Sequence, residues 1–266
     1  MKHNSEILQV KDLKISFTQY VKGLKTKQIT PIESLSLSIK AGEIMAVIGA
    51  SGSGKSLLAH AVLGILPSNA TCTGSIIYDG KELTEDRKAK LRGKEISFIP
   101  QSVNYLDPLM KVSKQVKIGL DKKNADKVQN DLFLSYGLKK EDGDLYPFQL
   151  SGGMLRRVLF ATSVRSGIKL VIADEPTPGI HPDALSAILN QLRKFADDGA
   201  AVMLITHDIV SALSVCDRVT VLKDGTTIET TNADNFSGDG ENLKHEYTRA
   251  LWSALPQNKF ILAQEV

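Results

Sequence analysis

One short string constrains the fold of this chain more than any other feature of its sequence. Residues 49–56 read Gly-Ala-Ser-Gly-Ser-Gly-Lys-Ser and match the phosphate-binding pattern G-x-x-x-x-G-K-[ST]. A short apolar run, Ile44 to Ile48, precedes the string, and the apolar segment Leu57 to Leu66 follows it. A buried strand that leads through a glycine-rich turn into a helix is the context in which this pattern binds phosphate. The sequence therefore predicts an open α/β sheet that binds a nucleoside triphosphate.

Each part of this string has a chemical reason. Glycines let the backbone turn so that successive N–H groups point into one concavity, and the helix that begins there adds its positive dipole end. Lys55 is expected to reach the β- and γ-phosphates, and the Ser56 hydroxyl is expected to coordinate Mg²⁺. The competing interpretation is a surface loop rich in glycine and serine. The predicted nucleotide-binding residues are Gly49, Ala50, Ser51, Gly52, Ser53, Gly54, Lys55 and Ser56.

A second apolar run ends in two carboxylates. Leu170 to Ala173 has the length of a central strand of a parallel sheet, and Asp174 and Glu175 follow it directly. Asp174 can hold Mg²⁺, usually through water, while Glu175 can polarise the attacking water. Adjacent strand residues point to opposite faces, so these two roles are not interchangeable.

Two more strand ends bring polar side chains to the same crevice. Val202 to Ile205 precedes Thr206-His207-Asp208, and a strand that starts at Ile96 delivers Gln101. Parallel strands present their carboxyl ends along the ligand crevice. His207 is expected to contact the γ-phosphate as a donor, although a lone histidine there is more often structural. The Gln101 amide is expected to sense Mg²⁺ and the attacking water.

Composition limits the class of protein and its surroundings. Hydrophobic residues make up 42% and charged residues 24%, which excludes a disordered or collagen-like chain. A net charge of +3 is too even to imply nucleic acid as the main partner. Cys72 and Cys216 show no metal-type spacing, and they fit a reducing compartment. Neither a signal peptide nor an apolar run of spanning length is evident, so we expect an intracellular chain that relies on partners for any membrane work.

Periodicity predicts the organisation of the first two thirds of the chain. Ile7 to Phe17 and Glu33 to Ile39 alternate as half-buried antiparallel strands do, and the lysine-rich stretch between them is typical of a solvated loop. Helical patterns dominate about 107–164, which indicates a helical insertion into the α/β core.

The last third is predicted to hold a helix after Pro182, a hairpin and a short tail. Val219 to Leu222 and Thr226 to Glu229 flank a turn that contains Gly225. We expect one core domain over 1–231, followed over 232–266 by a polar linker and a terminal helix. An apolar stripe on that helix favours packing on its own domain over docking on a partner. The stripe is made of Leu243, Tyr247, Leu251 and Leu255.

The segment Leu150-Ser151-Gly152-Gly153-Met154 resembles the signature sequence of ATP-binding cassette (ABC) ATPases. With the phosphate-binding loop, the resemblance extends from about Ile7 to Glu229. It implies a P-loop NTPase cassette with a RecA-like parallel-sheet core, an antiparallel β subdomain and a helical signature subdomain. It also implies that Ser151, Gly152 and Gly153 act in trans, completing the ATP site of a second cassette.

The family resemblance implies further roles for single residues. Phe17 matches the aromatic residue that stacks on adenine, with Tyr20 as a weaker substitute and an ordinary core position as the other interpretation. Gln101 matches the loop that couples to the transmembrane partner, Glu175 the catalytic base and His207 the switch histidine. The implied Mg²⁺ ligands are Ser56, Gln101 and Asp174.

One segment departs from the family pattern. His181 stands where the family usually has an aspartate that helps to couple the two ATP sites. A histidine of ordinary pKa is mostly neutral at neutral pH and offers no fixed negative charge. We expect either weakened communication between two unequal ATP sites, in a dimer with a different cassette, or a tolerated loop variation.

Several segments resemble the branch of importers for oligopeptides, dipeptides and nickel. They include Tyr146 to Arg157, Leu63 to Pro67 and Tyr247 to Leu251. Many peptide-importing members carry a cysteine cluster near the C-terminus, and its absence here tilts the prediction slightly towards nickel or metal chelates. The implied protein is an ATPase subunit on the cytoplasmic face of the cell membrane.

The implied partners are a second cassette, two transmembrane permeases and a substrate-binding protein that acts through the permeases, with no nucleic acid. Three alternatives stay open. The first is a regulatory cassette with weak hydrolysis, and the second is a soluble ABC ATPase of DNA repair or translation. The third is an exporter cassette, against which the importer-like segments argue.

Overall fold

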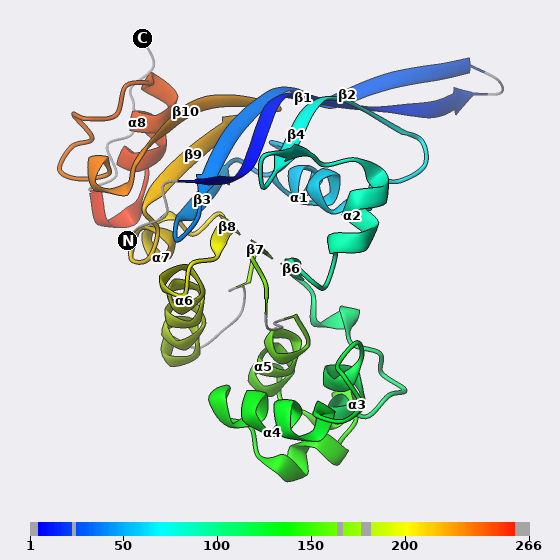
Figure 1. The fold of residues 1–266 in the computed structure, drawn as a ribbon. Helices are drawn as coiled ribbons and strands as arrows, with labels where there is room; N and C mark the ends of the chain where they lie inside the picture. Colours follow the sequence, from blue (N-terminus) through cyan, green and yellow to red (C-terminus); the bar gives the residue numbers. More distant parts are fainter. Residues whose placement is uncertain (1–4, 23–24, 164–166, 177–181, 259–266) are drawn as a thin grey trace.

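The computed structural model describes residues 5–22, 25–163, 167–176 and 182–258. Its described strands form one ten-stranded sheet in the order β5-β4-β1-β2-β10-β9-β3-β8-β7-β6 (Figure 1). Strand numbers that are out of sequence in this order mark crossovers, as in an α/β core. The sheet has a parallel half and an antiparallel half, and a helical subdomain is attached at the parallel end.

The parallel half of the sheet contains the strands whose carboxyl ends are predicted to lie along one crevice. β3 pairs in parallel with β8 and β9, and β7 pairs in parallel with β6 and β8. Every residue of β3, β7 and β8 is buried, which explains their continuous apolar runs. The strands are β3 (Ile44–Gly49), β6 (Ile96–Ile99), β7 (Leu170–Asp174), β8 (Ala201–Ile205) and β9 (Arg218–Lys223).

Helices cover this half of the sheet on both faces. α1 (Lys55–Leu63) packs on one face within a first apolar core, and α6 (Pro182–Asp197) and α7 (Ile209–Leu213) pack within a second. α1 ends at Gly64, whose φ of 66° is left-handed and suits glycine. The apolar pattern predicts a helix over Leu57 to Leu66, whereas the observed helix begins two residues earlier, at Lys55, and ends at Leu63.

The antiparallel half is larger than the sequence predicts. β1 (Glu6–Lys22) and β2 (Lys25–Lys40) pair along their length, and β4 (Ala70–Tyr78) lies on the other side of β1. The short β5 (Lys81–Glu82) completes this edge, and α2 (Glu85–Leu91) follows it. β10 (Thr226–Asn232) joins β9 to β2.

The prediction of a solvated loop around the lysine-rich stretch was wrong. Strand pairing continues as far as Lys22 and resumes at Lys25, with Tyr20 opposite Thr26, and this ribbon extends away from the body of the molecule (Figure 1). Antiparallel pairing uses backbone groups, so polar side chains on both faces do not prevent it. The hairpin predicted at Gly225 is confirmed, with left-handed φ values of 47° at Asp224 and 74° at Gly225.

The helical insertion is confirmed as a separate layer at the lower end of Figure 1. It contains α3 (Val112–Lys117), α4 (Ala125–Ser135) and α5 (Gly152–Ser163). Phe133 and Val158 are buried in a third apolar core that belongs to this subdomain. No described helix is both long and apolar enough to cross a membrane.

The terminal helix α8 (Glu246–Ser253) packs on its own domain, as the apolar stripe favours. Trp252 is buried in the second core against Phe236, and its indole Nε1 donates to the Gly238 carbonyl at 2.9 Å. The buried Glu229 carboxylate accepts from the backbone N–H of Lys244 and of His245. The segment predicted as a linker is therefore anchored on the core.

Candidate nucleotide site

The phosphate-binding loop is shaped by space as much as by chemistry. A Cβ on Gly49, at the end of β3, would lie 2.2 Å from the Leu222 carbonyl oxygen. Gly54 precedes α1 with a left-handed φ of 96°, and its Cβ would lie 2.7 Å from Cγ1 of Ile32. A side chain at Gly49 would therefore meet the backbone of β9, and one at Gly54 would meet the Ile32 side chain of β2, so both positions suit glycine.

Lys55 folds back over this loop. Its Nζ donates to the carbonyl oxygens of Gly49 and Ala50, both at 2.9 Å, and the residue is only 8% exposed. Burial lowers the pKa of Lys55, while the carboxylates of Glu175 and Asp174 act in the opposite direction. The ammonium therefore sits in the loop with exchangeable backbone partners, ready for phosphate oxygens.

Asp174 and Ser56 fit a magnesium ion. Burial is the largest cause that raises the pKa of Asp174, the charge of Glu175 adds to it, and a hydrogen bond from Ser56 acts against it. Its Oδ1 is buried and accepts no hydrogen bond. A buried carboxylate oxygen without a partner beside a serine hydroxyl is the hard oxygen set that Mg²⁺ prefers.

Glu175 directly follows the carboxyl end of β7 and has an unusual backbone conformation. Its φ is 45°, a left-handed value that costs a non-glycine residue free energy, and its backbone N–H donates to the Ile205 carbonyl at 2.8 Å. Nδ1 of His207 lies 2.8 Å from Oε2 of Glu175, although Oε2 accepts no well-aligned hydrogen bond. His207 itself is mostly exposed. The strained backbone holds the Glu175 carboxylate beside the mouth of the site.

A cavity of about 500 Å³ lies at this edge of the sheet. Eight of the residues predicted from the phosphate-binding loop and the strand ends line it. Of these predicted residues, those outside the lining are Gly49, Ala50, Ser53 and Asp174. Its walls are Pro31, Ser51, Gly52, Gly54, Lys55, Ser56, Leu57, Gln101, Glu175 and His207. Side chains from three strand ends and one helix N-terminus thus meet at a space of ligand size.

Phe17 is not part of this wall. It lies opposite Ile29 on β2 and Ala70 on β4, partly buried against the first core. Pro31 occupies the wall instead, and the sequence pattern gave no signal for it. The role of Phe17 as an adenine platform stays a prediction, as does the role of Tyr20.

Arg156 is a second residue near the site for which the sequence pattern holds no signal. This residue of α5 is 7% exposed, and its Nη1 donates to the backbone carbonyl of Gln101 at 2.7 Å. An arginine in a signature-like helix is unremarkable in a sequence, because its partner lies 55 positions earlier. Only the fold shows that the Gln101 loop and α5 are joined.

The predicted signature residues lie apart from the cavity wall. Ser151, Gly152 and Gly153 are exposed at the start of α5, and a Cβ on either glycine would meet nothing within 4 Å. The Ser151 hydroxyl accepts from the Met154 N–H at 3.3 Å. The described chain thus holds two glycine-rich helix N-termini, and only one of them forms a cavity with Glu175 and His207. His181 lies outside the described residues.

Comparison with known proteins places these features in a family. The sequence model described as "ABC transporter" matches residues 32–178. The oligopeptide transport ATP-binding protein OppD of Escherichia coli (strain K12) is 33% identical over 94% of this chain and 76% of its own length. OppD of Lactococcus lactis subsp. cremoris (strain SK11) is 34% identical over 95% of this chain and 77% of its own length.

Solved structures agree with the sequence comparison. The dimeric, post-hydrolysis state of the ATP-binding cassette MJ0796 bound to ADP and Pi superimposes with a TM-score of 0.73 and 26% identity, covering 85% of this chain and 99% of that one. The structure of cbiO1 from Clostridium perfringens, part of the ABC transporter complex cbiONQ, gives a TM-score of 0.70 and 29% identity, covering 86% and 90%.

Proposed function

The chain belongs to the ABC transporter family of ATP-binding proteins, and from this premise we propose that it is the ATP-hydrolysing subunit of a binding-protein-dependent importer. The observation that carries the proposal is the shared cavity wall of Lys55, Ser56, Gln101, Glu175 and His207. A phosphate-binding helix N-terminus, a carboxylate base and two polar sensors in one wall are the parts that nucleotide hydrolysis requires.

The residues of the wall divide the work. Loop N–H groups and the Lys55 ammonium bind the β- and γ-phosphates, and Lys55 leaves its two carbonyl partners to do so. Glu175 accepts the proton of the attacking water, and His207 donates to the γ-phosphate. When bound, Mg²⁺ would neutralise charge on the phosphate oxygens, held by Ser56, Asp174 and Gln101.

The exposed start of α5 supports a head-to-tail pair of cassettes. The start of α5 offers a second anion-binding helix N-terminus, formed by Ser151, Gly152 and Gly153. Unlike the phosphate-binding loop, it is exposed, and no described residue lies within 4 Å of a Cβ on either glycine. In the proposed pair, each ATP lies between the phosphate-binding loop of one cassette and this terminus of the other. ATP drives closure because it binds the closed pair more tightly than the open one.

The proposed partners follow from the family. The chain would sit on the cytoplasmic face of the membrane with a second cassette, which His181 suggests is a different chain, and with two permeases. A substrate-binding protein would act through the permeases. OppD relatives are named for oligopeptides, which favours a peptide cargo over the nickel or metal-chelate cargo that the missing cysteine cluster suggested.

Purification from native membranes tests this proposal. The tagged chain is extracted in mild detergent, its companions are identified by mass spectrometry, and MgATP hydrolysis is measured on the same preparation. We expect two permeases, a second cassette and hydrolysis. Recovery without any membrane partner would instead indicate a cytosolic ATPase, and partners without hydrolysis would indicate a regulatory cassette.

His181→Asp in the assembled complex tests the expectation of weak coupling between the two ATP sites. We expect the variant to raise the cooperativity of hydrolysis in ATP, because it restores a fixed negative charge at that position. Unchanged cooperativity and turnover would identify His181 as a tolerated loop variation.

A further inference from the structure

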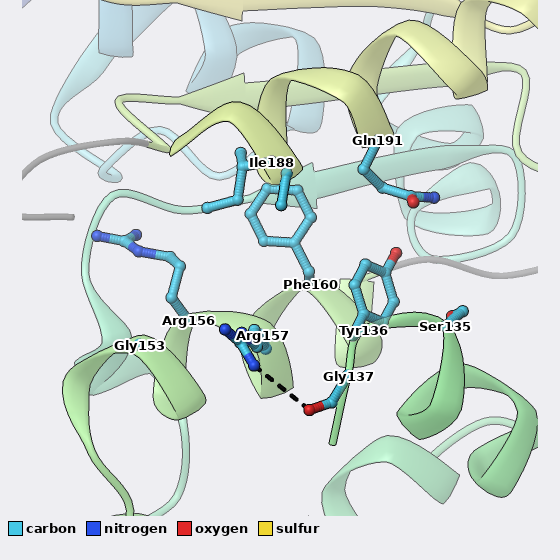
Figure 2. Close-up of a pocket in the computed structure, with 10 residues that line it drawn as sticks. Ser135, Tyr136, Gly137, Gly153, Arg156, Arg157, Phe160, Ile188 and Gln191 are labelled. Atoms are coloured by element: carbon cyan, nitrogen blue, oxygen red, sulfur yellow. Dashed lines mark hydrogen bonds between the residues drawn. The ribbon is translucent and has the colours of Figure 1, made fainter. Parts of the chain in front are cut away.

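Two neighbouring arginines of α5 reach in different directions. Figure 2 shows the Arg157 guanidinium beside the Gly137 carbonyl, to which Nη1 donates at 3.3 Å. The Arg156 guanidinium points away from the Phe160 ring, although Arg156, like Phe160 and Ile188, belongs to the lining of a cavity of about 290 Å³ (Figure 2). The bond of Arg157 stays within the helical subdomain, whereas Arg156 leaves it.

Arg156 ends on the backbone that follows β6. Its Nη1 donates to the Gln101 carbonyl at 2.7 Å and lies 3.4 Å from the Pro100 carbonyl. The side chain is 7% exposed, and burial lowers the pKa of the guanidinium. A buried cation is retained at such a place only where it has hydrogen-bond partners, and these two carbonyls are the partners that the structure gives.

The hydrogen bond between Arg156 and the Gln101 carbonyl joins two parts of the molecule that have different predicted roles. Gln101 lines the nucleotide cavity, while Arg156 lies a little more than one turn into α5, whose N-terminus carries Ser151 and Gly152. One charged hydrogen bond therefore joins the backbone of a cavity residue to the helix that presents the exposed terminus. A shift of either segment strains or breaks this bond.

We propose that Arg156 is a positioning residue that holds the Gln101 loop and the N-terminal turn of α5 in one fixed relation, so that ATP contacts at Gln101 move the exposed helix terminus. The inference rests on the proposed function for its catalytic consequence. Its structural part, the attachment of the loop to α5, does not depend on hydrolysis.

Hydrogen exchange of the full-length chain without nucleotide tests the attachment. Arg156→Gln is compared with Arg157→Gln, a matched loss of one arginine bond that lies inside the subdomain. We expect faster exchange over residues 101–106 in R156Q, by about tenfold for the loss of a hydrogen bond to a charged group, and wild-type exchange there in R157Q. Equal exchange in R156Q and wild type overturns the proposal. Arg156→Met, which keeps an apolar stem, replaces R156Q if that variant does not fold.

Steady-state hydrolysis in the assembled complex tests the consequence. R156Q is expected to lower kcat at least about tenfold while KM for MgATP stays within about twofold, because the phosphate-binding loop is untouched. Arg156→Lys keeps a cationic donor and should recover most of kcat. A rise in KM with unchanged kcat, or no rescue by lysine, contradicts a positioning role. Absence of hydrolysis in the wild-type complex would refute the proposed function, and the exchange result would still decide the attachment.

Discussion

The N-termini of α1 and α5 have similar sequences and very different surroundings. Around α1, Ser53 and Lys55 are 3% and 8% exposed, and a Cβ on Gly49 or Gly54 would collide with neighbouring atoms. Around α5, Gly152 and Gly153 are exposed and face open space. Residues of the same chain therefore enclose the N-terminus of α1, whereas the N-terminus of α5 is exposed.

This difference separates two reasons for a glycine. At Gly49 the reason lies inside the fold, since the Leu222 carbonyl leaves no room for a side chain. At Gly152 no neighbour within the described chain demands a glycine, and no left-handed φ does either. In the proposed pair of cassettes, a glycine at this position would leave room for the nucleotide held by the second cassette.

Glu175→Gln should give the largest effect and would test whether the chemistry belongs to the α1 site alone. Removing the base is expected to lower kcat by about 10²- to 10⁴-fold, with MgATP still bound. Steady-state hydrolysis and a nucleotide-binding assay measure the two quantities. Glu33→Gln, which neutralises an exposed carboxylate paired with Lys14, is the control. Turnover near the wild-type rate in E175Q would assign the base elsewhere.

Gly49→Ala tests the claim that the α1 terminus is fixed by packing. The added methyl group would meet the Leu222 carbonyl, and we expect the free energy of unfolding to fall by about 3 kcal/mol. Urea unfolding of the nucleotide-free chain measures this. Gly152→Ala is the matched control and should change stability by less than about 1 kcal/mol, since alanine fits there. Similar losses in both variants would remove the contrast between the two termini.

Gly152→Ala sharpens the comparison in the other direction. In the assembled complex we expect kcat to fall by about tenfold, because a methyl group would crowd the nucleotide that the partner cassette presents. The isolated chain should bind MgATP as tightly as the wild type, as isothermal titration can show. A complex of this variant with normal turnover would mean that the exposed terminus takes no part in the reaction.

The smallest effect concerns the pH dependence of stability. Burial is the main cause that raises the pKa of Asp174 in the folded state above its ordinary value of 3.8. The contribution of Asp174 to the free energy of unfolding is therefore fully present below pH 3.8, and it is lost as the pH rises through the folded-state pKa. We expect the stability of the nucleotide-free wild type, relative to Asp174→Asn, to decrease across this window. Urea unfolding at a series of pH values measures the difference. A difference that grows with pH would show that the carboxylate is stabilised as an anion.

The polar residues at the ends of the parallel strands could be predicted from the sequence. The runs before Gly49, Asp174 and His207 are all buried strands, and parallel order alone brings their ends to one edge of the sheet. Gln101 followed from the same rule. The hydrophobic pattern carries this information because strands covered on both faces must be apolar throughout.

Contacts that depend on the backbone or on residues distant in the sequence could not be predicted in this way. The ribbon of β1 and β2 is held by main-chain pairing, which leaves no trace in an alternation of side chains. Long-range folding places Pro31 in the wall of the nucleotide cavity and Arg156 on the backbone carbonyl of Gln101, and nothing in their local sequence indicates it. The roles of Phe17, Ser151 and His181 stay predictions, because each depends on a ligand or on a second chain.

The β1–β2 ribbon has a consequence for how the protein behaves at high concentration. Beyond Thr18, no third strand pairs with β1 in the part of the chain that the structure describes, so backbone donors and acceptors are open to another copy of the chain. Exposed lysines, Lys25 and Lys27, keep such copies apart by charge repulsion, which salt screens. Colloidal stability should therefore be best at low ionic strength, and buffers rich in salt should favour edge-to-edge association through this ribbon.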